Sequence, residues 1–286
     1  MRTWIGAAPF LLVHAAALLA IFYPPTAPLL VLAGASYLVR MWAITAGYHR
    51  YFAHRAYRTS RVFQFLLALL GTTAMQQGPL WWASSHRRHH KDADGPGDPH
   101  SPVQRGFWYA HVGWIFDRSQ VRDLSNVRDL SAFPELRWLD RHARIPLVGY
   151  ALLCWAIAGM GGVVWGFVIS TLVLGHVTFL INSVAHLWGT RPYPTRDASR
   201  NNALLAVLTL GEGWHNNHHH HMSSARQGFR WWQIDMSYYS LAALRRLGVV
   251  WAVRQPPAAG GGILNRPMRN HPLPQRNPGR EQRKAA

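Results

Sequence analysis

The sequence lacks residues on which several protein classes depend. Its 286 residues include one cysteine, Cys154, which excludes a disulfide framework within one chain and every cysteine-rich zinc motif. Only 12 residues are acidic, and none of them precedes Asp92. Charged residues make up 15% of the chain, whereas soluble domains contain about 25%. An ordinary soluble globular domain is therefore not expected.

The motifs of three enzyme classes are also missing. Neither the zincin pattern His-Glu-x-x-His nor the hydrolase pattern Gly-x-Ser-x-Gly occurs. Soluble di-iron proteins with bridging carboxylates use two Glu-x-x-His motifs. The chain has a single such spacing, Glu212 with His215, which argues against that class.

Charge is absent from two long stretches, residues 3–39 and 145–190. Short segments rich in Pro or Gly divide them into four apolar spans, at roughly residues 5–23, 27–48, 145–158 and 163–183. A membrane-spanning helix needs about 20 apolar residues. The pattern predicts an all-α integral membrane protein with four transmembrane helices arranged as two hairpins, and a helical cap on one side of the membrane.

The basic residues predict the orientation of these helices. Fourteen Lys or Arg lie between His49 and Arg144, fourteen more follow His186, and the two inner connections contain none. By the positive-inside rule, the cap and both termini face the cytoplasm, at the inner membrane if the source is bacterial. The net charge of +18, taken alone, would also fit a nucleic-acid-binding protein. The four apolar spans argue against this alternative.

The composition of the two terminal segments leads to two further predictions. Residues 1–254 are expected to form one membrane domain, and residues 255–286 a disordered basic tail rich in Pro, Gly and Arg. A cleaved signal peptide is not expected, because the first apolar run is longer than a typical signal and lacks a small-residue cleavage site.

Seventeen histidines occur, and nine of them cluster at the predicted cytoplasmic ends of the apolar segments. These nine are His49, His54, His86, His89, His90, His186, His215, His218 and His219. Spacings of three and four residues place side chains on one helix face. His49 and His54 are five residues apart, about 140° on an ideal helix, so they share a face only if the helix ends between them or they straddle two metals. Nine ligands predict two metal ions, and neutral imidazole suits Fe, Zn, Cu and Ni.

These clusters resemble the histidine boxes of a known family. Together with Asn182-Ser-Val-Ala-His186, Gly211-Glu-Gly-Trp-His215 and Arg230-Trp-Trp-Gln-Ile-Asp235, they are similar to the membrane-bound fatty acyl-CoA desaturases. The closest resemblance is to the stearoyl-CoA or delta-9 group and its bacterial relatives. It covers roughly residues 27 to 240.

The resemblance implies a di-iron centre held by the nine histidines, with Asn182 contacting one metal through water. It implies O2-dependent removal of two hydrogens from a saturated fatty acyl chain, most often acyl-CoA, to give a cis double bond at the delta-9 position. The electrons would come from a separate donor protein, such as a ferredoxin, a rubredoxin or a b-type cytochrome with its reductase. Zinc cannot supply this oxidation because it has no redox chemistry.

The resemblance also implies substrate contacts. Gln77, Trp82 and Arg118 occupy positions at which the family contacts substrate, and Tyr37 and Met41 are expected near the far end of the acyl tunnel. One departure concerns the headgroup: the animal enzymes have an Arg-Asp pair just before the second box, where this chain has Ser84 and Ser85.

Other functions fit part of the pattern. A histidine-box hydroxylase acting on an alkane, a sterol or a carotenoid would use the same ligands and release an alcohol. A membrane metal transporter or metal-storage protein would place its ligands inside the spans, near the midplane, whereas the clusters lie at the ends. A basic membrane-anchored scaffold would bind no iron.

Overall fold

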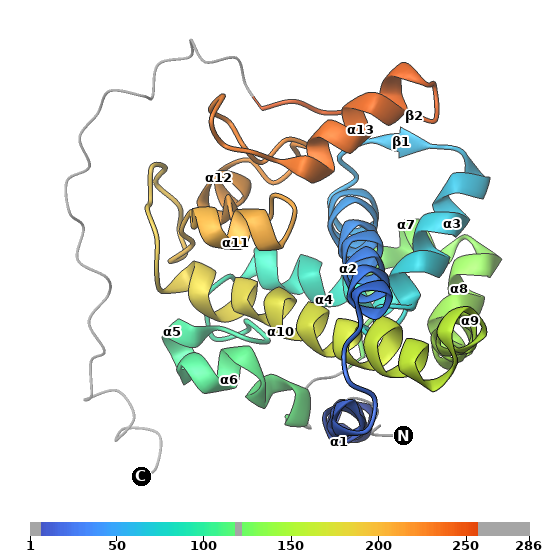
Figure 1. The fold of residues 1–286 in the computed structure, drawn as a ribbon. Helices are drawn as coiled ribbons and strands as arrows, with labels where there is room; N and C mark the ends of the chain where they lie inside the picture. Colours follow the sequence, from blue (N-terminus) through green and yellow to red (C-terminus); the bar gives the residue numbers. More distant parts are fainter. Residues whose placement is uncertain (1–6, 118–121, 257–286) are drawn as a thin grey trace. The chain divides into compact units, whose positions relative to one another are not determined.

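Helices make up most of the structure, a computed structural model that describes residues 7–117 and 122–256. In chain order they are α1 (Ala7–Ala17), η1 (Leu18–Ile21), α2 (Ala27–Trp42), η2 (Ala43–Ala53), α3 (Arg61–Thr72), α4 (Pro79–Lys91), α5 (Pro102–Arg105), α6 (Phe107–His111), η3 (Gly113–Phe116), η4 (Ser125–Val127), α7 (Arg128–Ser131), α8 (Pro134–Arg141), α9 (Arg144–Gly162), η5 (Val163–Ile169), α10 (Ser170–Ser183), η6 (Val184–His186), α11 (Ala203–Leu208), α12 (His215–His220) and α13 (Met236–Arg246) (Figure 1). Two short strands, β1 (Arg58–Thr59) and β2 (Val250–Trp251), pair antiparallel.

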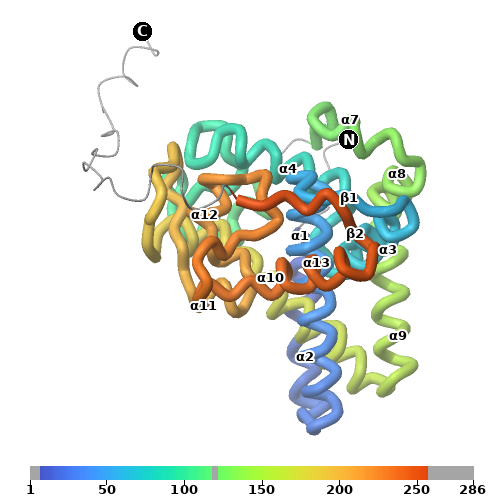
Figure 2. Tube along the Cα trace, turned by 90° about the horizontal axis from the view of Figure 1, so that it is seen from above, coloured from blue at the N-terminus to red at the C-terminus, as the bar shows by residue number. Residues whose placement is uncertain are grey.

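Two helical stretches are long and apolar enough to cross a membrane, Ala27–Ala53 and Arg144–His186. The first joins α2 to η2, and it starts after Thr26, with a proline in its first turn, where the missing N–H of proline costs nothing. Figure 2 shows α2 and α9 extending side by side from the shorter helices. The apolar helices Ala7–Ile21 and Arg61–Thr72 are shorter, so the arrangement of four spans in two hairpins stays a prediction.

The second long helix is broken near its middle. Ala158 and Gly159 leave helical geometry, and Gly159 adopts φ 57°, a conformation that glycine reaches without steric cost. After the break the chain returns along α9, and a Cβ on Gly162 would lie 2.1 Å from the carbonyl oxygen of Cys154. The small residues predicted to separate two spans therefore allow a close reversal of the chain.

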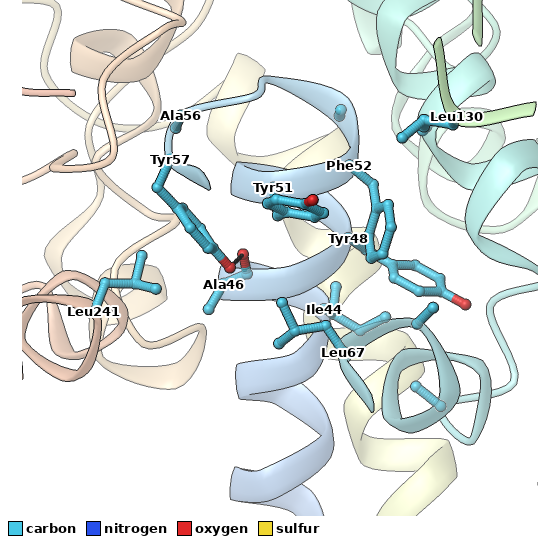
Figure 3. Packing of buried hydrophobic residues seen from close by; sticks show 14 of the residues in the cluster. Ile44, Ala46, Tyr48, Tyr51, Phe52, Ala56, Tyr57, Leu67, Leu130 and Leu241 are labelled. Atoms are coloured by element: carbon cyan, nitrogen blue, oxygen red, sulfur yellow. Dashed lines mark hydrogen bonds between the residues drawn. The ribbon is translucent and has the colours of Figure 1, made fainter. Parts of the chain in front are cut away.

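The apolar core surrounds η2. Tyr48, Phe52 and Tyr57 from this region are fully or almost fully buried, and they pack with Leu67 of α3 and with residues of the later helices (Figure 3). The ring of Tyr48 lies against Gly71, where an added Cβ would approach a ring carbon to 2.3 Å. This packing fixes the segment that carries the first two predicted metal ligands.

A buried arginine lies within the apolar part of α2. Arg40 is 0% exposed, and its guanidinium donates hydrogen bonds to Ser170 Oγ at 2.7 Å, to Thr171 Oγ1 at 2.6 Å and to the carbonyl oxygen of Thr73 at 3.2 Å. Its carbon Cζ also lies 4.8 Å from the centre of the Tyr150 ring. Among the described residues no carboxylate pairs with it, so uncharged groups from α10 solvate the cation.

The predicted tail is largely outside this description. Residues 255 and 256 are the last ones described, and residues 257–286 lie outside the described residues. The predicted boundary at residue 254 therefore stays a prediction.

Candidate metal centre

Helix α4 carries three of the predicted ligands, and its start is fixed by a carboxylate. Asp140 Oδ1 accepts hydrogen bonds from the backbone N–H groups of Leu80 and Trp81, at 3.0 and 2.9 Å. These groups have no partner within the helix, so the carboxylate anchors the first turn. The anchored turn sets the direction in which the histidines of α4 project, and these are His86, His89 and His90.

His49 and His54 lie at the end of a π-helical segment. The backbone N–H of His54 donates to the carbonyl of His49 at 3.1 Å, five residues back. The two rings are 4.7 Å apart between centres. The helical segment ends at Ala53, between the two residues, which is one of the two conditions under which they were predicted to share a face. The wider π turn also departs from the separation of about 140° expected on an ideal α-helix. Short π segments are frequent at functional sites.

The structure brings all nine predicted histidines together, in two groups. Within each group the candidate ligand atoms lie within 4.8 Å of one another. The five-histidine group contains His49, His54, His86, His90 and His218. The four-histidine group contains His89, His186, His215 and His219. His89 and His90, adjacent on α4, fall into different groups, and so do His218 and His219 on α12. Two metal ions lying side by side would require this division.

The Nε2 atoms of the five-histidine group converge. Nε2 of His86 lies 2.9 Å from Nε2 of both His54 and His90. Nε2 of His218 lies 3.1 Å from that of His49 and 3.0 Å from that of His90. One ring nitrogen carries one hydrogen or one lone pair, so it cannot satisfy two such neighbours by hydrogen bonding. A cation among the lone pairs accounts for the arrangement.

Burial keeps most of these imidazoles neutral. It lowers the pKa of five of them well below 6.5, and the neighbouring histidines lower it further; these five are His54, His86, His90, His215 and His218. Burial also lowers the pKa of His219 to about 4, although Asp197 acts in the opposite direction. Neutral imidazole is the form that binds metal, so these ligands are available at neutral pH.

Four carboxylates lie behind the histidines, on the Nδ1 side of the rings. The pairs are His49 with Glu212 at 2.5 Å, His89 with Asp98 at 3.0 Å, His186 with Asp94 at 2.8 Å and His219 with Asp197 at 2.9 Å. A carboxylate at Nδ1 fixes the tautomer and the orientation of the ring, and leaves Nε2 for the metal. None of these four acids was predicted from the sequence as the partner of a histidine. Their only signal was that a chain with 12 acids places several of them beside the histidine boxes.

Asp98 and His89 show the electrostatics of such a pair. Burial alone would raise the pKa of the Asp98 carboxyl, but the His89 ring and hydrogen bonds hold it below its usual range. Burial lowers the pKa of His89, and Asp98 more than reverses this effect. The carboxylate therefore stays charged and keeps the Nδ1 hydrogen on the ring.

Arg50 connects the centre to the C-terminal helices. It is 1% exposed, and it donates to Glu212 at 3.2 Å, to Asp235 at 2.8 Å and to the carbonyl oxygen of Ala225 at 2.8 Å. Asp235 also accepts the backbone N–H of Tyr238 in the first turn of α13. The ion pairs therefore hold Glu212 in place behind His49.

The donor set fits two redox-active ions. Imidazole is a suitable ligand for Fe, as it is for Zn, Cu and Ni, and Nε2 of His219 is buried without a hydrogen-bond partner among the described residues. Asn182 lies on α10, half-buried, about one turn before His186. Its contact with a metal through water stays a prediction.

Two of the predicted substrate residues lie close to this centre in the sequence and in the fold. The ring of Trp82 stacks on His86 with 4.9 Å between centres, and its Nε1 donates to Gln76 at 3.1 Å. Gln77 has φ 69°, and its carbonyl oxygen accepts the hydroxyl of Tyr48 at 3.1 Å. Their contact with substrate stays a prediction.

The other three predicted substrate residues are Tyr37, Met41 and Arg118. Met41 is buried in the core, and the Tyr37 hydroxyl donates to the carbonyl oxygen of Leu208 at 2.5 Å. Arg118 lies outside the described residues. The structure therefore places Tyr37 and Met41 in α2 below η2, without showing what they bind.

Comparison with curated proteins gives several relatives. Delta-9 acyl-lipid desaturase 2 of Arabidopsis thaliana is 40% identical over 251 residues, which cover 86% of this chain and 81% of the relative. The sn-2 palmitoyl-lipid 9-desaturase of Nostoc sp. (strain 36) is 35% identical over 263 residues, 90% of this chain and 92% of the relative. The probable lipid desaturase ADS3.2, chloroplastic, of Arabidopsis thaliana is 42% identical over 217 residues, 74% of this chain, and the chain spans 60% of that relative's length.

A family model gives the same result over almost the whole chain. The model described as fatty acid desaturase matches residues 4–253, a range that includes all nine histidines of both groups. The long apolar helices agree with a membrane-associated family of this kind. The chain therefore belongs to the fatty acid desaturase family, a family of oxidoreductases.

Proposed function

We propose that the chain desaturates a saturated fatty acyl chain in an O2-dependent reaction, introducing a cis double bond at the delta-9 position. The observation that supports this proposal most is the division of nine buried histidines into groups of five and four beside two long apolar helices. Each group would hold one iron ion. Iron, when bound, supplies the redox chemistry that activates O2 for attack on an unactivated C–H bond.

The protein's own contribution is to position these ions and to exclude competing chemistry. The carboxylates behind His49, His89, His186 and His219 keep the rings oriented. Trp82, stacked on His86, presents an apolar surface beside the centre. A bound acyl chain lying along such surfaces would place only certain carbons near the ions, which is how orientation selects the position of reaction.

We propose a lipid-linked acyl chain as the substrate, with acyl-CoA as the alternative. Two of the relatives described above are named as acyl-lipid or palmitoyl-lipid desaturases. The residues at the positions of the family's Arg-Asp pair, Ser84 and Ser85, are buried in α4, and the Ser84 hydroxyl donates to the carbonyl oxygen of Asp123. Neither serine supplies the charge that a CoA headgroup would need.

The proposal includes a topology and a partner. Four membrane spans, with the termini and the metal centre on the cytoplasmic side, would follow from the distribution of basic residues. Electrons would come from a separate protein, such as a ferredoxin, a rubredoxin or a b-type cytochrome with its reductase. A basic surface would attract an acidic donor.

The test is to express the chain, with a donor system, in cells that lack their own desaturase. Total lipids are extracted, and new double bonds are located by mass spectrometry of derivatised fatty acid methyl esters, separately for the CoA and glycerolipid fractions. We expect a new cis-delta-9 monoene, first in the glycerolipids. His89→Ala should abolish it because one ligand is lost, whereas His142→Ala should retain it because His142, whose ring lies against Trp138, belongs to neither histidine group.

The alternatives give different products. A hydroxylated lipid would support the hydroxylase interpretation and contradict desaturation. Iron bound at about two ions per chain, with no modified lipid in the presence of a working donor, would favour metal storage or transport. Full product formation by His89→Ala would contradict the nine-ligand assignment.

A further inference from the structure

Helix α13 lies across the junction between α2 and η2. Nε1 of Trp42 donates to Ser240 Oγ at 2.6 Å, and the hydroxyl of Thr45 lies 2.6 Å from that of Ser237. In α2, large apolar side chains are exposed as far as Val39, whereas all residues of η2 are buried. The helix therefore lies where the exposed apolar stretch of α2 ends, which is the level of the membrane interface in the topology proposed above.

One flank of α13 is apolar and exposed. Met236, Tyr239 and Leu247, which directly follows the helix, lie within about 80° of one another on an ideal helix, and all three are exposed. Leu204 and Val207 of α11 are exposed as well. Figure 2 shows α11 and α13 on the side of the shorter helices from which α2 extends. Exposed apolar side chains at this level suit contact with lipid.

Another flank of α13 borders a pocket with a volume of about 340 Å³. Its lining consists of Tyr238, Ala242, Arg245, Arg246, Val253 and Gln255. The Tyr238 hydroxyl donates to Gln255 Oε1 at 3.1 Å. The backbone N–H of Arg254 donates to the carbonyl of Ala56 at 2.8 Å, beyond the end of η2, whereas α13 contacts the start of η2. The pocket therefore lies on the side of α13 that faces away from the exposed part of α2.

The charge of this pocket is unbalanced. Arg245 and Arg246 are exposed, and no acid lines the pocket in the part of the chain that the structure describes. The guanidinium carbon of Arg226 lies 5.6 Å from the centre of the Tyr238 ring, which adds a third positive charge beside the same wall. Arginine is suited to phosphate because it can donate two parallel hydrogen bonds to it. The pocket is therefore suited to an anion.

The two flanks adjoin each other, which separates a lipid from other anions. Arg246 of the pocket lies about 20° from Tyr239 of the apolar flank on an ideal helix. A soluble anion or an acidic protein would use the charge alone. A ligand with a phosphate and an apolar part would contact both flanks at once.

We propose that the pocket binds the phosphate of an anionic phospholipid, whose acyl chains lie against the apolar flank of α13. This inference rests on the membrane topology proposed above, but not on the reaction. The cytoplasmic leaflet is rich in anionic lipids, and a helix with basic and apolar sides lies in the plane of the interface. The bound lipid would also stabilise α13, whose first turn Asp235 caps and links to Arg50.

The test uses the purified full chain in a neutral detergent, titrated with phosphatidylglycerol or with the zwitterionic phosphatidylcholine. Native mass spectrometry measures the lipid retained, and thermal unfolding measures the stabilisation. We expect preferential retention of phosphatidylglycerol and a higher melting temperature with it. Arg245→Gln combined with Arg246→Gln should weaken its binding about 20- to 30-fold, since each basic residue near an anionic surface contributes about fivefold. Without added lipid, the melting temperature should change little.

Two further variants separate a pocket from general attraction by charge. Ala242→Leu fills the pocket and keeps both arginines, so it should weaken phosphatidylglycerol binding too, and it gives a second measurement if the double variant does not fold. Arg141→Gln is the matched control, because Arg141 is an exposed arginine in the last turn of α8 and does not line the pocket. This variant should bind phosphatidylglycerol as the wild type does.

Four results would overturn the proposal. Unchanged binding in Ala242→Leu, or an equal loss in Arg141→Gln, would indicate general attraction by charge. Equal retention of phosphatidylcholine would contradict the preference for an anionic lipid. Equal affinity for glycerol 3-phosphate, which has no acyl chains, would indicate a site for a soluble anion.

The fourth result concerns a protein partner. Weaker binding of an acidic ferredoxin by the double variant, with unchanged lipid binding, would assign the surface to a protein instead. None of these measurements requires desaturation. The lipid site and the proposed reaction can therefore fail independently of each other.

Discussion

The carboxylate of Asp98 shows how one side chain positions a metal ligand. Its two oxygens lie 3.0 Å from Nδ1 of His89, and they also accept the backbone N–H groups of Asp94 and His100. The loop after α4 is therefore built around this carboxylate. Removing its charge should loosen the ring of His89 without removing the ring itself.

Asp98→Asn tests this role. We expect iron to bind roughly 10- to 100-fold more weakly, the usual effect of losing a carboxylate partner of a metal-binding histidine. Iron retained per chain during titration with a chelator measures the change. Glu135→Gln is the matched control, because Glu135 pairs with the exposed residue Arg61, and this variant should bind iron as the wild type does. Unchanged affinity in Asp98→Asn would contradict the positioning role.

The nine histidines could be predicted at this scale, but their partners could not. Helical spacings of three and four bring ligands together within one helix, and this rule needs only local sequence. Asp94 pairs with His186 across 92 positions, and Asp197 pairs with His219 across 22. No local spacing predicts such contacts, because they depend on how loops fold over the centre. The resemblance to the desaturase family, by contrast, is confirmed.

At the scale of the elements, η2 and α3 meet at a glycine. Gly71 of α3 leaves room for the buried ring of Tyr48, whose hydroxyl lies 2.9 Å from Thr72 Oγ1. Tyr48 immediately precedes His49. Any side chain at position 71 would displace the ring and the π-helical segment with it.

Gly71→Ala should therefore destabilise the protein by about 1–3 kcal/mol, the usual cost of overpacking a core. Thermal unfolding in detergent measures the effect, and iron content should fall as well because His49 moves. Gly34→Ala is the matched control: Gly34 lies in α2, with nothing within 4 Å of an added Cβ. The control should be neutral or slightly stabilising, since alanine favours helices more than glycine does. Equal melting temperatures for the two variants would contradict this packing argument.

The apolar elements could be predicted more readily than their local geometry. The absence of charge in residues 3–39 and 145–190 indicated the long helices, and the break at Ala158 and Gly159 lies where glycines accumulate. The π turn of η2 could not be predicted, because periodicity arguments assume 3.6 residues per turn. A helix end between His49 and His54 was one of the predicted ways for them to share a face, and η2 does end at Ala53.

At the scale of the whole molecule, the buried histidines make stability depend on pH. The folded protein holds the pKa of His86, His90, His215 and His218 well below 6.5. In the unfolded chain these groups protonate near their ordinary value. The unfolded state of the metal-free protein therefore binds more protons below pH 6.5, and folding stability is lost as the pH falls.

We expect the melting temperature of the metal-free protein to drop between pH 7 and pH 5.5. Each such histidine contributes about 1 kcal/mol of destabilisation one pH unit below 6.5. Calorimetry or fluorescence across this range measures the effect. Iron-loaded protein should depend less on pH there, because the ligands' lone pairs are occupied. A flat profile for the metal-free protein would contradict the buried, neutral state of these rings.

Arg40 also constrains how the chain is made. Its hydroxyl partners, Ser170 and Thr171, follow it by 130 and 131 positions, so they leave the ribosome roughly 10 s later at about 5–20 residues per second. In the proposed topology α2 meets the bilayer before these partners are made, with a guanidinium that costs about 2.5–3.5 kcal/mol near the centre of a lone helix. The insertion of α2 is therefore fully stabilised only when the second predicted hairpin, which carries Ser170 and Thr171, has been made. Substitutions that remove the hydroxyl of Ser170 or Thr171 should therefore increase the degradation of newly synthesised chains.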